Sequence, residues 1–149
     1  RRGRDRAAGA GMIGSYVHGG RIGVLVEVNC ETDFVVKTDD FQTLVEELSL
    51  HIAAMNPQYV KHDEVPDELI AKEKSLFEDE VKESGKPAEH ATKIVEGKLD
   101  KWMAGICLLE QPYYKDDKMT IEDLVKAAIG KLGENIVVRR FVRLELGGE

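Results

Sequence analysis

Apolar residues at every second position from Ile22 to Cys30 predict a β-strand that is covered mainly on one face. The face expected to be buried carries Ile22, Val24, Val26, Val28 and Cys30. From Asp39 to Met55 the apolar residues recur at helical spacing, with Asp39 and Gln42 placed as the N-cap and its reciprocal partner. A short corner, residues 32–35, therefore joins a predicted strand to a predicted helix.

Two further strands are predicted to complete a sheet. Residues 12–18 alternate around Ile13, Ser15 and Val17, and the Gly19-Gly20 pair suits a tight antiparallel turn into the strand that follows. Residues 135–146 form a last strand with two distinct faces. One face is expected to carry Ile136, Val138, Arg140, Val142 and Leu144, and the other Val137, Arg139, Phe141, Arg143 and Glu145.

Helical spacing marks the segments between these strands. Residues 66–85 and a helix beginning at residue 88 each carry an apolar stripe, and we expect them to form an antiparallel helical hairpin. A shorter helix is capped by Thr120 and ends at Gly133. Asn56 and Pro57 are expected to end the earlier helix with extended backbone. The predicted fold class is α+β: a three-stranded antiparallel sheet with helices packed on one face and an inserted helical hairpin.

The sheet face without helices is predicted to be unusually apolar. It is expected to present Tyr16, Leu25, Val137 and Phe141. This is more apolar surface than a monomer ordinarily leaves in water, so the pattern favours a homodimer formed through the sheet.

Composition narrows the class of partner. The chain has 149 residues and a formal net charge of -7, which opposes nonspecific attraction to nucleic acid and to anionic membranes. No apolar run approaches the roughly 20 residues that span a bilayer, and the chain does not open on a signal peptide, so we expect a cytoplasmic protein.

Residues 1–11 are basic and rich in glycine and alanine, which predicts a linker before one domain at residues 12–149.

Two rival functions remain open at this point. An enzyme could use Cys30 as a nucleophile with His18 or His51 as its base, but Cys30 lies on the strand face predicted to be buried. Cys30 and Cys107 lack the spacing of a metal site, so we expect no metal. We also expect that the protein uses no cofactor and is not an enzyme. The second rival function is that of a dimeric regulatory module that binds a small molecule.

Two blocks of sequence resemble bacterial translation elongation factor Ts. The first is VEVNCETDFV followed by FQTLVEELSLHIAAMNPQYV, and the second is GENIVVRRFVRLE near the end of the chain. The resemblance implies the core or dimerisation domain of that family, and nothing before residue 12 matches the family's small N-terminal helical module. It also implies guanine nucleotide exchange on the GTPase elongation factor Tu.

The resemblance gives the corner a role that its residues alone do not specify. Without the resemblance, the sequence favours a Phe34 ring that fills the core beneath the turn while Asp33 caps the helical turn after it, because single phenylalanines are usually buried. In the family, the corresponding segment is inserted into elongation factor Tu beside its magnesium and phosphate site. The resemblance therefore implies that Thr32, Asp33, Phe34 and Val35 bind the partner and dislodge its magnesium ion.

Overall fold

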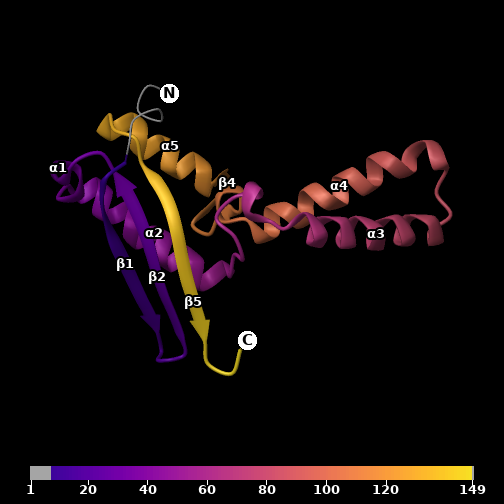
Figure 1. Cartoon of the computed structure of the whole chain (residues 1–149), viewed down its shortest axis with the longest axis horizontal. Helices are drawn as coiled ribbons and strands as arrows, with labels where there is room; N and C mark the ends of the chain where they lie inside the picture. The colour runs from indigo at the N-terminus through magenta and orange to yellow at the C-terminus, as the bar shows by residue number, and fades with distance from the viewer. Residues whose placement is uncertain (1–7, 149) are drawn as a thin grey trace.

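Three antiparallel strands form the sheet of this protein, as predicted, and their order is β1-β2-β5. The computed structural model describes residues 8–148, in which the strands are β1 (Ala10–His18), β2 (Ile22–Cys30) and β5 (Val137–Glu145). Helices α2 (Asp39–Met55) and α5 (Ile121–Leu132) pack on one side of the sheet, and a long helical hairpin projects away from it (Figure 1). The predicted α+β class is confirmed.

The turn between β1 and β2 follows the prediction. Gly19 and Gly20 have φ values of 58° and 70°, and the Arg21 amide donates to the His18 carbonyl over 2.9 Å. β1 begins at Ala10, so Ala10 and Gly11 belong to the sheet and not to the predicted linker. The rest of that linker is mostly residues 1–7, which lie outside the described part of the chain.

The faces of β1 are the reverse of those expected. Tyr16 pairs with the buried Val24, and Ser15 pairs with the exposed Leu25, so Tyr16 points toward the helices. Ile13 and Val17 consequently lie on the uncovered face. The reason is the register, because residues directly opposite one another in an antiparallel pair point to the same face.

The predicted faces of β5 are wrong beyond residue 138, because the strand contains a β-bulge. Val28 pairs with Val138 while Glu27 pairs with Arg140, which leaves Arg139 as the extra residue. Phe141 therefore faces the core, whereas Val142 and Leu144 face outward. Arg140 also forms an ion pair with the neighbouring strand, since its Nε lies 2.8 Å from Glu27 Oε1.

Helix α2 supplies most of the core beneath the sheet. Phe41, Leu48 and Ile52 are fully buried against the inward valines of β2. Gly14 of β1 allows this approach, because a Cβ at that position would overlap Val45 Cγ1.

The two ends of α2 differ in detail from the prediction. Thr38 is the N-cap in place of Asp39, and its hydroxyl accepts a hydrogen bond from the Phe41 amide over 3.2 Å. At the other end Asn56 adopts the left-handed conformation, with φ of 47°, and is not extended. The left-handed cap lets the Asn56 amide bond the Ile52 carbonyl and so close the last turn.

The inserted hairpin consists of α3 (Asp67–Glu83) and α4 (Ala88–Ile106), as predicted. Its apolar stripes pack mainly on each other, and only Val81, Val95 and Met103 are buried within the two helices. The hairpin extends well beyond the sheet (Figure 1). The expected core packing of the α4 stripe is therefore limited to the inter-helix contact and a small cluster at the base of the hairpin.

Short elements connect these parts of the chain. They are α1 (Asp33–Val36), the 3-10 turns η2 (His62–Glu64) and η3 (Leu108–Glu110), and the two-stranded pair β3 (Pro112–Tyr113) and β4 (Asp116–Thr120). The pair β3 and β4 was not among the strands predicted from the sequence. The capping box of α5, formed by Thr120 and Asp123, and its left-handed Gly133 follow the prediction.

Candidate functional site

The corner between β2 and α2 exposes one aromatic ring. Phe34 lies in the single turn α1 and is 84% exposed, so it does not fill the core of its own chain. Its neighbour Val35 is only 7% exposed and packs into the main core. The turn therefore directs one of two adjacent apolar side chains inward as an anchor and the other outward.

A carboxylate from a distant loop holds the N-terminal side of the corner. Glu134, in the connection between α5 and β5, accepts hydrogen bonds from the Glu31 amide, the Thr32 amide and the Thr32 hydroxyl, over 3.2, 3.1 and 2.7 Å. In return, the Asn135 amide donates to Glu31 Oε2 over 2.6 Å. These reciprocal bonds join the end of β2 to the start of β5.

The C-terminal side of the corner is held by Thr38. Its hydroxyl donates to the Val35 carbonyl over 2.7 Å, and its amide donates to the same carbonyl over 3.0 Å. The same hydroxyl also caps α2. The backbone of the corner is thus fixed at both ends, while Asp33 and Phe34 point their side chains into solvent.

The four residues that the resemblance implies to bind the partner differ in their accessibility. Asp33 and Phe34 are accessible to a partner, Thr32 is engaged by Glu134, and Val35 is buried. Sequence reasoning missed Glu134, although it lies in the GENIVVRRF block that was recognised as a signature. Its position directly before a strand gave the only hint, and nothing local indicated which segment it would contact.

Cys30 does not have the environment of a catalytic nucleophile. The thiol is fully buried and lies 3.3 Å from the Thr32 carbonyl, to which it donates. Burial raises the pKa of this thiol, and the nearby Glu134 carboxylate raises it further, so the reactive thiolate is disfavoured. Cys107 is also buried, and burial raises the pKa of its thiol to about 11.

His51, the other partner in the enzyme hypothesis, is committed to a structural network. Its Nε2 lies 2.9 Å from Gln111 Oε1, and its Nδ1 accepts from the Tyr114 amide over 3.3 Å. An imidazole that accepts at Nδ1 and donates at Nε2 is neutral. Burial lowers the pKa of His51, although the Gln111 contact acts in the opposite direction.

The lowered pKa of His51 predicts that the free energy of unfolding decreases as the pH falls below about 6.5. The pKa of His51 in the folded protein lies below its ordinary value of 6.5, so the unfolded chain binds this proton more readily. The stabilisation is complete above about pH 6.5 and is lost as the pH falls through that value toward the folded pKa, by at most about 1.4 kcal/mol per pH unit. Urea unfolding at a series of pH values from 7.5 to 5.5 measures it. A constant free energy of unfolding over this range would contradict the prediction.

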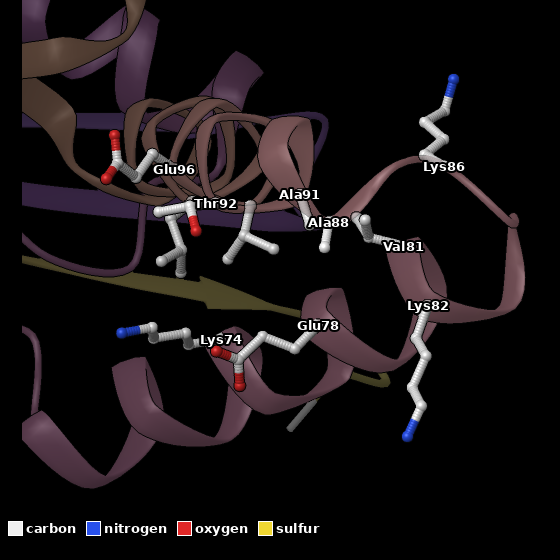
Figure 2. Close-up of a pocket in the computed structure, with 11 residues that line it drawn as sticks. Lys74, Glu78, Val81, Lys82, Lys86, Ala88, Ala91, Thr92 and Glu96 are labelled. Carbon is white, nitrogen blue, oxygen red and sulfur yellow. The ribbon is translucent and has the colours of Figure 1, made fainter.

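A cavity among the described residues lies in the hairpin, far from the corner. It has a volume of about 470 Å³ and a floor formed by Val81, Ala91 and Val95. Lys82 and Lys86 point away from it, whereas Lys74, Glu78 and Thr92 are among the polar residues that line it (Figure 2). Among the described residues no cluster of His, Cys, Asp and Glu could hold a metal ion.

The chain is similar to known proteins over almost its whole length. The family model described as Elongation factor TS matches residues 1–147. The chain is 57% identical over 143 residues to Elongation factor Ts of Coprothermobacter proteolyticus, 52% identical over 143 residues to that of Geobacter sp. (strain M21), and 51% identical over 144 residues to that of Heliobacterium modesticaldum. The matches cover 95%, 95% and 96% of this chain but 73%, 66% and 67% of the respective relatives, so it spans about two thirds of their length.

The family model and the relatives place the protein among the translation elongation factors. Within that class, the chain belongs to the elongation factor Ts family.

Proposed function

We propose that the protein is a guanine nucleotide exchange factor for elongation factor Tu. It binds the GDP complex of that GTPase, displaces the magnesium ion and so promotes the exchange of GDP for GTP. The observation that carries the proposal is the exposed Phe34 ring on a corner that is fixed on both sides. An exposed aromatic side chain on a rigid support loses little conformational entropy when a partner covers it.

The physical basis is competition for one conformation of the GTPase. Magnesium neutralises the phosphates of the bound nucleotide, so a change in its surroundings weakens a site that depends on charge. Phe34 would enter the GTPase near this ion, with Asp33 making polar contacts beside the ring. Thr32 and Val35 would support the segment from within this chain, because Thr32 bonds Glu134 and Val35 is buried.

Magnitudes show that Phe34 cannot act alone. Burying a phenylalanine contributes about 1.5 to 3 kcal/mol, whereas a nanomolar nucleotide is held by about 12 kcal/mol. A wider contact surface must therefore supply most of the distortion energy, and Phe34 directs it to the magnesium site. By reciprocity, the nucleotide weakens binding of this protein by the same factor by which the protein weakens binding of the nucleotide.

We also propose that the uncovered sheet face forms a homodimer. Among the described residues it exposes large apolar side chains from all three strands: Ile13, Val17, Leu25, Val137, Val142 and Leu144. The bulge and the register make this set larger than the sequence indicated, since only Leu25 and Val137 were placed on this face correctly. Two copies related by a two-fold axis would cover both faces at once.

The proposed function also implies where the protein acts and which other molecules it needs. No helix among the described residues has the length and apolar character needed to cross a bilayer. We expect a cytoplasmic protein that acts without a cofactor, catalyses no covalent step and does not contact nucleic acid directly.

Purified protein and elongation factor Tu loaded with a fluorescent GDP analogue test the proposal. We expect the protein to accelerate release of the analogue in stopped-flow measurements, and a pull-down to retain more GTPase without GDP than with added GDP. Release at the intrinsic rate, together with no retained GTPase under either condition, would contradict the proposal.

A further inference from the structure

We infer that Glu134 is a positioning residue for nucleotide exchange, acting through Thr32 to fix the direction in which Phe34 leaves the corner. The inference rests on the proposed function of Phe34. Glu134 lies 102 residues from Thr32 in the sequence, yet its carboxylate is bonded to both the amide and the hydroxyl of that residue. Glu134 itself lies in the loop between α5 and β5 and is half-buried, whereas Asp33 and Phe34 are exposed.

The chain changes direction at the residue that Glu134 holds. Thr32 is extended, with φ of -133° and ψ of 155°, and α1 begins at Asp33. Amide groups at the start of a helix have no acceptor within that helix, and β2 has ended at Cys30. The Glu134 carboxylate accepts from the amides of Glu31 and Thr32, so it provides the acceptors that neither element supplies there.

We call the hydrogen bonds from Glu31 and Thr32 to the Glu134 carboxylate the Glu134 clamp. The residues on both sides of this clamp are fixed to the sheet. Glu31 directly follows β2, and its carboxylate accepts from the Asn135 amide close to the start of β5. Asn135 and Ile136 are buried, so the loop that carries Glu134 is fixed against the core. The orientation of Phe34 is therefore set relative to the sheet and not only by its own short turn.

The orientation of Phe34 matters because, in the proposed mechanism, the ring must contact the GTPase at one particular place, near the magnesium site. If the corner rotated freely, part of the binding energy would be spent on ordering it and not on distorting the GTPase. A residue that only stabilised the fold would change the melting temperature without changing the maximal rate of nucleotide release. Kinetic measurements on folded variants separate these two roles.

The test compares Glu134→Ala, Glu134→Gln and Thr32→Val with the wild-type chain, using Glu68→Ala on α3 as a control at an exposed glutamate. Gln keeps a carbonyl oxygen for the two amides and can donate to the Thr32 hydroxyl, so it should restore most of the clamp. Val replaces the Thr32 side chain with one of nearly equal size and removes only the hydroxyl bond. It keeps the inference testable if Glu134→Ala does not fold.

The first measurement needs no GTPase. Amide hydrogen exchange followed by NMR should be about tenfold faster at Glu31 and Thr32 in Glu134→Ala, because both amides lose their acceptor. The second is the rate of GDP release from elongation factor Tu at saturating exchange factor. We expect a fall of about tenfold in Glu134→Ala, a half-saturating concentration within about twofold of wild type, a smaller fall in Thr32→Val, recovery in Glu134→Gln, and no change in Glu68→Ala.

Two results would overturn the inference. One is unchanged amide exchange at Glu31 and Thr32 in Glu134→Ala, and the other is a wild-type maximal release rate in that variant although its amides exchange faster. Failure of the proposed function is distinguishable, because Phe34→Ala would then release GDP at the wild-type rate whatever the amide exchange data show.

Discussion

Replacing Phe34 by alanine is expected to slow GDP release from elongation factor Tu by one to two orders of magnitude at a saturating level of each form. The ring would contribute about 1.5 to 3 kcal/mol when covered by the partner, and each 1.36 kcal/mol corresponds to a factor of ten in rate. Because the side chain is 84% exposed, its removal leaves no cavity in the protein itself. Stopped-flow release of a fluorescent GDP analogue measures the change.

Two comparisons make the Phe34 experiment specific. The melting temperature of Phe34→Ala should match that of the wild type, since substitutions at exposed positions usually alter stability by less than about 0.5 kcal/mol. Asp33→Ala should show a smaller loss of rate, because Asp33 would make polar contacts beside the ring. Equal release rates for Phe34→Ala and wild type would remove Phe34 from the mechanism, and an unchanged rate for Asp33→Ala would leave Asp33 without a role in exchange.

A charge placed on the uncovered sheet face should separate the proposed dimer. Val142 points outward from β5 opposite Leu25 of β2, and both side chains are more than half exposed in the single chain. Val142→Glu would bury an unpaired carboxylate from each copy, at a cost of about 3 kcal/mol or more for each charge. We expect the dimer dissociation constant to rise at least about a hundredfold, as measured by sedimentation equilibrium.

The control for this experiment is Leu76→Glu, which adds the same charge at an exposed leucine of the hairpin. It should leave the dimer intact, because α3 lies away from the sheet (Figure 1). A monomeric wild type at tens of micromolar would contradict the dimer proposal directly. A Val142→Glu variant that associates as strongly as wild type would exclude this face as the interface.

The sequence by itself was sufficient for the type and order of the main elements. The period-two run of β2, the helical spacing of α2, and the caps at Thr120 and Gly133 are local signals, and the structure confirms each. Such signals involve residues a few positions apart, so no knowledge of the partner segments is needed to interpret them. The resemblance added where to look for a site, namely the corner at residues 32–35.

Tertiary structure decided which side chains that framework presents. The faces of β1 and β5 depend on register and on the bulge at Arg139, and these are properties of strand pairs that no single strand contains. Phe34 and Val35 are adjacent and both apolar, and only the orientation of α1 against the core buries Val35 and exposes Phe34. Glu134 reaches Thr32 only after β5 has paired with β2, since that pairing brings the two segments together.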